Sequence, residues 1–209
     1  MSALPALAPL EAVAARVRQV MGPAVLGSHI QHGELTILAE AQSMPALAMF
    51  LRDDSALLFR CLVDVCGADY PSRPARFDVI YHFLSLHKNL RLRVKIEAQE
   101  GAAVPSLTGV FANADWYERE AFDMYGILFS EHPDLRRILT DYGFSGHPLR
   151  KDFPVTGYVE LRYDVDQARL VYEPVKLQQQ YRKFDFLSPW EGMTMPLPGD
   201  EKARGGETR

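Results

Sequence analysis

The sequence predicts an α+β fold, in which helices pack on one face of a small, mostly antiparallel sheet and a long extended segment follows at the C-terminal end. Three observations predict it. Apolar residues recur at helical spacing close to the N-terminus, short β-branched and aromatic segments follow them, and prolines interrupt every regular pattern in the last third of the chain. Helices and strands that do not alternate strictly are typical of this class.

A helix and a hairpin are the first predicted elements. The helix ends at Gly22 and Pro23, and residues 32–33 form a turn between strands at 25–30 and 35–39. The apolar positions that predict the helix are Leu10, Val13, Ala14, Val17 and Met21.

A second helix and three strands follow. Ser43 has the character of an N-cap, and Pro45 that of an early helical proline. Strands are predicted at 57–65, 77–86 and 90–97. Apolar and charged residues alternate in the last of them, so we expect a half-buried strand with one basic, solvated face. The residues of that face are Arg91, Arg93, Lys95 and Glu97.

A loop at 101–108 leads to a third helix, because this stretch contains a proline and lacks a periodic pattern. Asn113 can cap the helix, and Asp115 places a negative charge in its first turn. The helical pattern then runs to Tyr125, and Gly126 ends it.

The C-terminal segment is aromatic but carries no core pattern of its own. Residues 142–190 hold ten of the chain's 22 aromatic residues and a finely mixed charge, unlike a disordered tail. Side chains of these types anchor interfaces, so we expect this segment to bury them against a partner. The predicted divisions are an α+β domain at 1–140, an extended partner-binding segment at 141–192 and a flexible end at 193–209.

Charge and hydropathy exclude several classes of protein. The net charge of -4 argues against nucleic acid as a partner, because phosphate contacts need a basic face. No apolar run approaches the roughly 20 residues that cross a bilayer. The N-terminus also lacks the pattern of a secretion signal, so we expect the chain to stay in a bacterial cytoplasm and to reach a membrane only through other proteins.

Residues that could bind a cofactor are few. Cys61 and Cys66 lie five positions apart on a predicted strand, so we expect their thiols on opposite faces, buried as small hydrophobic groups. An iron–sulfur cluster or a structural zinc needs more ligands. The sequence also lacks the glycine-rich nucleotide-binding motifs. We therefore expect neither a cofactor nor a metal on this chain and no catalytic residue.

The third predicted helix carries the densest group of charges: Glu118, Arg119, Glu120 and Asp123. Arg119 and Asp123 are four positions apart and can pair along one face. Two interpretations remain open. The carboxylates, together with His132, could relay protons, or the charges could form a solvated or interfacial ion-pair network, which is the commoner role of a charged helix.

From Glu118 to Pro154 the chain reads EREAFDMYGILFSEHPDLRRILTDYGFSGHPLRKDFP. This run resembles the signature of the C subunit of NADH-quinone oxidoreductase, which belongs to the 30-kilodalton subunit family of respiratory complex I. Later segments, which include FDF at 184–186 and SPWEG at 188–192, extend the resemblance. The chain departs from the family's pattern at Ser130 and Glu131, where smaller or amide residues are common.

The resemblance implies a subunit without flavin or clusters, bound in the peripheral arm on the cytoplasmic side of the bacterial inner membrane. Its C-terminal extension would lie against the quinone-site subunit (the D subunit of the complex), and FMN, iron–sulfur clusters and quinone would belong to partner subunits. An equivalent subunit of a membrane-bound hydrogenase is an alternative. The residues expected at the partner interface are Glu118, Arg119, Glu120, Asp123, His132, Arg136, Arg137, His147, Arg150, Lys151, Asp152, Tyr158, Arg182, Phe184, Phe186 and Trp190.

Overall fold

The computed structural model describes residues 7–179 and residue 181. The chain forms two compact units, Met1–Gly157 and Tyr158–Arg209. The first unit therefore extends beyond the division expected at residue 140. The later residues of this unit stay with it because they bond to its third helix and to its sheet.

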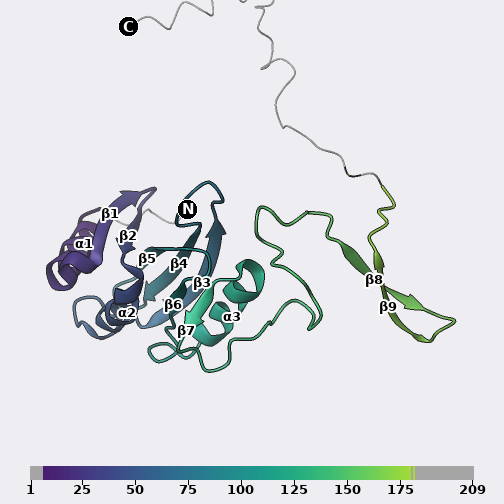
Figure 1. Cartoon of the computed structure of the whole chain (residues 1–209). Helices are drawn as coiled ribbons and strands as arrows, with labels where there is room; N and C mark the ends of the chain where they lie inside the picture. Colours follow the sequence, from purple (N-terminus) through teal and green to yellow (C-terminus); the bar gives the residue numbers. More distant parts are fainter. Residues whose placement is uncertain (1–6, 180, 182–209) are drawn as a thin grey trace, which may run out of the picture. The chain divides into compact units, whose positions relative to one another are not determined.

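A five-stranded sheet forms the centre of the first unit, in the order β1-β2-β5-β4-β3 (Figure 1). The strands are β1 (Val25–Gln31), β2 (Glu34–Ala39), β3 (Cys61–Asp69), β4 (Phe77–Ser85) and β5 (Leu90–Ala98). Only β2 and β5 pair in parallel, and the other neighbours are antiparallel. The predicted turn at residues 32–33 does join β1 to β2, and both of its residues have positive φ.

One face of the sheet is apolar and the other is polar. Tyr81 of β4 and its cross-strand neighbour Val94 of β5 are fully buried on the first face. On the second face, His82 pairs across the ladder with Arg93. The predicted basic face of β5 is present, although ion pairs leave Arg93 and Lys95 only partly exposed. This alternation follows from the two-residue period of a strand.

Three helices contribute to the core on the apolar face: α1 (Leu7–Met21), α2 (Met44–Asp53) and α3 (Ala114–Tyr125). Their buried side chains join those of the strands in one cluster, which contains Leu10 and Val17 of α1, Leu47 and Leu51 of α2, and Ala114 and Ala121 of α3. The predicted α+β class, with helices on one face of a mostly antiparallel sheet, is confirmed.

Several local predictions were wrong in detail. Leu57 and Phe59 are buried, but the third strand begins only at Cys61, because Leu58 has a φ of 53° that no strand can hold. Ser43 occupies the N-cap of α2 without a side-chain bond to the helix, and its hydroxyl donates to Glu40 instead. The stretch at 101–108 also contains a short strand, β6 (Ala103–Pro105), parallel to β7 (Leu128–Ser130).

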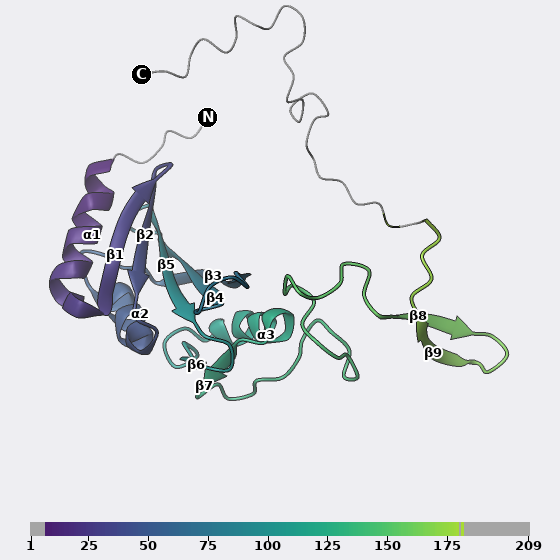
Figure 2. The same ribbon diagram turned by 45° about the horizontal axis from the view of Figure 1, so that its top comes forward.

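The described part of the second unit contains an antiparallel hairpin of β8 (Val159–Asp164) and β9 (Arg169–Pro174), which the sequence did not predict. Prolines in this region argue against a long helix and a central strand. However, Pro174 lies at the last pair of the ladder, opposite Val159, where a missing N–H costs little. Figure 2 shows the hairpin from a second direction.

The packing of α3 on β3 depends on Gly67. A Cβ atom at this position would lie 2.6 Å from Cδ2 of Tyr125 and 3.1 Å from Cδ1 of Ile127. We expect Gly67→Ala to lower the free energy of unfolding by about 1–3 kcal/mol, as overpacking does in other cores. Gly109→Ala is the matched control, because nothing lies within 4 Å of its Cβ position. Equal chemical denaturation midpoints for the two variants would contradict the tight approach of α3 to β3.

Candidate partner-binding site

Helix α3 carries the predicted charged group. Its C-terminal end forms as the sequence predicts, but its N-terminal end does so only in part. Gly126 ends the helix in the left-handed region with a φ of 76°, and its N–H donates to the carbonyl of Phe122. Asn113 stands at the N-cap, but its side chain does not bond to the helix. The Asn113 amide instead donates to the carbonyl of Leu62 at 2.8 Å, which ties the start of α3 to β3.

Glu118 is fully buried on the core side of α3. Its carboxylate accepts hydrogen bonds from the Ser106 hydroxyl at 2.6 Å and from the backbone N–H of Leu107 at 2.7 Å. Burial raises the pKa of Glu118, and these two bonds only partly oppose the shift. The side chain therefore holds the loop before α3 in place, and it favours a proton more than an exposed glutamate does.

Asp123 is also fully buried, but it accepts five hydrogen bonds. Arg137 donates to Oδ1 at 2.8 Å, and the N–H groups of Leu139 and Thr140 donate to Oδ2 at 2.7 and 2.8 Å. The N–H of Ile138 and the Thr140 hydroxyl complete the set. Burial alone would raise the pKa of Asp123, but these donors together hold it far below its usual range.

Arg119 does not pair with Asp123, which corrects the expectation from their spacing. In the described part of the chain no ion pair joins them. The guanidinium of Arg119 donates to the backbone carbonyls of Arg136 and Arg137, at 3.1 and 3.2 Å, and stacks over Trp116. Helical spacing allowed the pair, but Arg137 lies in sequence beyond the helix and supplies the better-placed charge.

The carbonyl groups in the last turn of α3 bond to the segment that follows β7. His147 Nδ1 lies 2.9 Å from the carbonyl of Asp123, the N–H of Leu149 donates to Met124, and Arg150 Nε donates to Tyr125 at 2.6 Å. A helix leaves these last carbonyls without internal partners, and a positive charge is favourable there. Residues 137–150 thus form a strap held on the end of α3.

The strap continues into an ion-pair group at the end of β3. Arg76 binds Asp69 at 2.7 Å and Asp152 at 2.9 Å, and both Arg76 and Arg150 reach Glu100. The backbone N–H of Lys151 donates to Asp69 at 2.7 Å, so this carboxylate binds both a side chain and the main chain that follows the strap. The pKa of Asp69 is lowered, and the largest cause is the pair of hydrogen bonds from Arg76.

His132 lies between Asp115 and Glu118. Its Nε2 is 3.2 Å from Oδ1 of Asp115 and 3.9 Å from Glu118, while Nδ1 accepts the N–H of Asp134. The preceding Glu131 has a φ of 60°, a conformation that costs a glutamate more than an amide residue. This is where the sequence departs from the pattern of the family that it resembles.

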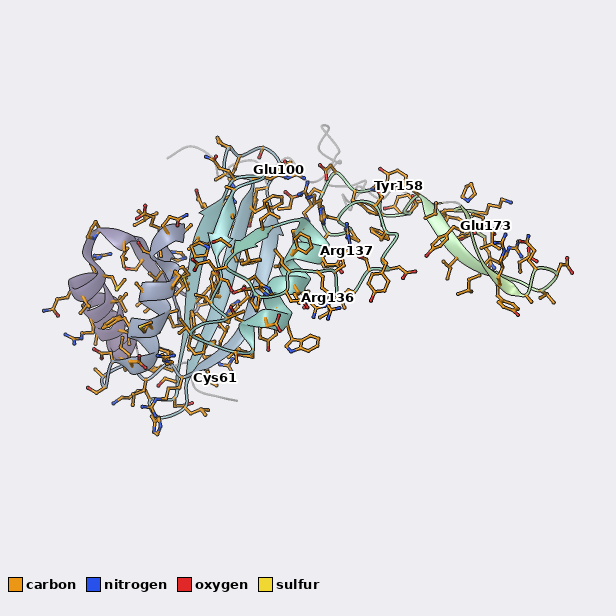
Figure 3. All side chains as sticks on the ribbon, turned by 60° about the horizontal axis from the view of Figure 1, so that its bottom comes forward. Cys61, Glu100, Arg136, Arg137, Tyr158 and Glu173 are labelled. Atoms are coloured by element: carbon orange, nitrogen blue, oxygen red, sulfur yellow. The ribbon has the colours of Figure 1, made fainter. Side chains whose placement is uncertain are left out.

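The remaining predicted interface residues differ in exposure. Glu120 is exposed on α3, and the side chain of Arg136, just before the strap, is 61% exposed (Figure 3). Lys151, Asp152 and Tyr158 are also exposed. The predicted interface residues that lie outside the described part of the chain are Arg182, Phe184, Phe186 and Trp190.

The described hairpin of the second unit has one apolar and one charged face. Cross-strand pairs place apolar side chains together on the first face: Val159 with Pro174, Leu161 with Tyr172, and Tyr163 with Leu170. Leu161 is 48% exposed and Leu170 is 60% exposed. On the other face Arg162 forms ion pairs with Asp164 and Glu173, which is labelled in Figure 3. The sequence alternation could have revealed this face, but the prolines masked it.

The two cysteines lie on the same face of the sheet rather than on opposite faces. A β-bulge between Leu62 and Asp64 shifts the register, so Cys61 pairs with Leu84 and Cys66 with Ile80. Both thiols are half-buried rather than buried, and burial raises the pKa of Cys66. Their partners are four positions apart on β4, about 13 Å along a strand, which is too far for one metal ion.

Within residues 7–179 and 181 no group of three His, Cys, Asp or Glu side chains could hold a metal ion. No described helix is long and apolar enough to cross a membrane. The fold and the site together define a protein whose buried charges hold its own chain in place, and whose second unit exposes an apolar face.

Comparison with known proteins gives the family. Residues 37–159 match the family described as respiratory-chain NADH dehydrogenase, 30 Kd subunit. The C subunit of the NADH-quinone oxidoreductase of Xanthobacter autotrophicus is 61% identical over 196 residues, which cover 94% of each chain. The corresponding C subunit of Parvibaculum lavamentivorans is 64% identical over 179 residues, 86% of this chain and 90% of that protein. The chain belongs to the 30-kilodalton subunit family of the NADH-quinone oxidoreductase complex, respiratory complex I.

A solved structure shares the fold. A chain of the membrane-bound sulfane sulfur reductase, an archaeal respiratory membrane complex, superposes with a TM-score of 0.59 at 19% identity. The match covers 69% of this chain and 85% of that one.

We expect Asp123→Asn to lower the free energy of unfolding by about 3–5 kcal/mol, because Arg137 then loses its buried counter-charge and the strap loses acceptors. Glu120→Gln is the matched control on the exposed side of α3 and should change the free energy of unfolding by less than about 0.5 kcal/mol. Thermal unfolding of the purified chain measures both. A small effect of Asp123→Asn would show that the strap does not depend on this carboxylate.

The raised pKa of Glu118 predicts a pH dependence of stability. Because the folded state binds the proton more tightly, the contribution of Glu118 is full below its unfolded pKa and is lost as the pH rises through its folded pKa. The Glu118→Gln variant has no proton to lose at this position. As the pH rises above the ordinary pKa of a glutamate, the melting temperature of the parent protein should therefore fall relative to that of Glu118→Gln. Parallel curves would mean that Glu118 titrates as an exposed glutamate does.

Proposed function

We propose that the chain is a non-redox docking subunit of the peripheral arm of proton-translocating NADH-quinone oxidoreductase, and that it braces the quinone-site subunit of that complex. The exposed apolar face of the β8–β9 hairpin carries the proposal. An isolated two-stranded hairpin is at best marginally stable in water, so a face of this kind needs a surface to cover it.

The charges of the hairpin support an apolar mode of docking. Arg162 is already paired with Asp164 and Glu173, so the charged face satisfies itself and can remain in water. The apolar face, by contrast, offers a partner apolar and aromatic side chains such as Leu161, Tyr163 and Leu170. Binding through this face gains free energy from the burial of apolar area rather than from charge.

The strap supports the same function in a different way. Several of the predicted interface residues bond within their own chain, to the loop before α3, to the strap or to the end of the helix: Glu118, Arg119, Asp123, Arg137 and Arg150. We propose that they define the path by which the chain leaves the first unit. The exposed members of the set, which a partner can reach, are Glu120, Arg136, Lys151, Asp152 and Tyr158.

In the proposed arrangement the chain lies on the cytoplasmic side of the bacterial inner membrane and holds no cofactor, while FMN, iron–sulfur clusters and quinone belong to its partners. The identity to the C subunits of two NADH-quinone oxidoreductases favours NADH over hydrogen as the electron source. The direct proton relay through Glu118, Glu120, Asp123 and His132 has less support, because the carboxylate of Asp123 is occupied by five donors of its own chain.

We expect Leu161→Asp and Leu170→Asp to abolish most assembly of the complex, because each buries an unpaired charge in the docking face. Val171→Asp is the matched control on the charged face of the same hairpin, beside Arg162, and should assemble normally. Native gels of membranes from cells that carry each variant measure assembly. Normal complexes from Leu161→Asp and Leu170→Asp would remove the hairpin from the docking interface.

Turnover separates a docking role from a catalytic one. Quinone reduction by NADH, divided by the flavin content of the membranes, should stay near normal in those complexes that do assemble. If Glu118→Gln complexes assembled fully but turned over at least about tenfold more slowly, a barrier increase of about 1.4 kcal/mol, the relay would replace the docking role.

A further inference from the structure

The sheet has an open edge at β1, on the side of the molecule where α1 lies (Figure 2). In an antiparallel ladder every second residue directs its N–H and C=O away from the neighbouring strand. Counted from the Gln31–Glu34 pair that closes the two-residue turn, the outward groups of β1 belong to Ser28 and Ile30. Among the described residues, β2 is the only strand that pairs with β1.

The edge lacks the features that usually block strand addition. Its sequence, VLGSHIQ, contains neither proline nor lysine, and its bulge lies at the beginning, between Val25 and Gly27. At the opposite edge, by contrast, the Asn113 amide donates to the main-chain carbonyl of Leu62 in β3, and a bulge lies between Leu62 and Asp64. Of the two edges, β1 is thus the one that remains available over residues 28–31.

A groove of about 400 Å³ runs beside this edge, between β1 and α1. One wall is a stripe of α1, and the other includes the two residues of β1 whose main chain points outward. The residues that matter for its shape and charge are Glu11, Ala14, Ala15 and Arg18 of α1 and Ser28 and Ile30 of β1. The two alanines keep the middle of the groove open. An extended segment that paired with β1 would place every second side chain in this groove, the geometry of β-strand addition.

The charges at the two ends of the groove indicate what the segment carries. In the described part of the chain neither Glu11 nor Arg18 forms an ion pair, whereas the neighbouring Arg16 binds Asp54. Arg18 donates one hydrogen bond to the Ser28 hydroxyl, which leaves other N–H groups of its guanidinium for a carboxylate. Seven residues of helix separate Glu11 from Arg18 by about 10 Å along the axis, about 3 Å less than the span of residues i and i+4 of a strand, a difference that long side chains can bridge.

We propose that β1 accepts an extended segment of another subunit of the same complex as an additional strand. Every second side chain of this added segment faces the groove. These side chains are an acidic residue opposite Arg18, an apolar residue opposite Ala14 and Ala15, and a basic residue opposite Glu11. A second copy of this chain is the poorer occupant. The groove has eight lining residues, and a stable dimer needs about 20–30 on each side, whereas an added strand gains affinity from main-chain hydrogen bonds.

The inference rests on the proposed docking role, and the two can fail separately because the groove and the hairpin are different surfaces. The first test places a photo-crosslinking residue, p-benzoylphenylalanine, at the exposed position His29. His29 is one of the eight lining residues, but by strand alternation its side chain points to the other face from Ser28 and Ile30, so the substitution leaves the groove wall at those two residues unchanged. Irradiation of the purified complex, followed by peptide mass spectrometry, should yield one site in another subunit. That site should lie in a segment with acidic, apolar and basic residues at alternate positions.

Two variants test the groove itself. Ala15→Trp fills it, and Ser28→Pro removes an outward N–H from the edge without touching the pairing with β2. Each should reduce assembly at least about tenfold, while the melting temperature of the isolated chain stays unchanged. Ala12→Trp is the matched control, because Ala12 is exposed on the same helix but does not line the groove. If Ser28→Pro lowers the melting temperature, its effect on assembly no longer reports on the edge, and the assembly of Ala15→Trp alone tests the inference.

A crosslink to a second copy, a crosslink within the same chain, or the absence of any crosslink would overturn the inference. So would normal assembly of Ala15→Trp, or equal losses of assembly in Ala15→Trp and Ala12→Trp. If Ala15→Trp assembles normally while Leu161→Asp does not, the groove proposal fails and the docking role of the hairpin stands. If Leu161→Asp assembles normally while Ala15→Trp does not, the docking role of the hairpin fails and the proposal of an added strand stands.

Discussion

The buried carboxylate of Asp123 is the constraint on which the irregular part of the first unit depends. Removing a carboxylate from water is costly unless donors surround it, and here the donors come from Arg137, from the Thr140 hydroxyl and from three consecutive backbone N–H groups. Residues 138–140 have no helix or sheet to satisfy those N–H groups. The helix therefore supplies the acceptors for a segment that has no regular structure.

Glu118 and Asp123 show how the number of donors decides the state of a buried acid. Both lie fully buried on one helix, five positions apart. Glu118 accepts two hydrogen bonds, too few to offset burial, and its pKa rises. Asp123 accepts five, more than enough, and its pKa falls. Burial alone predicts a raised pKa for both acids and fails for Asp123, so two acids on one helix can have opposite chemistry.

The sequence predicted the elements that depend on local patterns. The alternation in β5, the turn at residues 32–33 and the glycine that ends α3 are all set within a few residues. What it missed depends on partners distant in the chain. The bulge in β3 puts Cys61 and Cys66 on one face, and Arg137 rather than Arg119 binds Asp123. Spacing along a helix shows which of its residues can pair, but it does not show whether a residue from another part of the chain will bind one of them instead.

The same limit applies to the C-terminal segment. Its prolines argue against a long helix and a central strand, and Pro174 lies at the end of β9, where it breaks no interior pair. The absence of a core pattern was visible in the sequence. The attachment of the strap to the first unit was not, because it depends on carbonyl groups at the end of α3, which no side-chain pattern reveals.

If the β8–β9 hairpin docks as proposed, its open face would link the amount of this chain in a cell to the amount of its partners. A copy made in excess keeps Leu161, Tyr163 and Leu170 in water, and exposed apolar surfaces of this kind are what chaperones and proteases act upon. A copy docked through this face would hide them. The stoichiometry of an assembly can in this way be corrected after synthesis, by the removal of whatever remains uncovered.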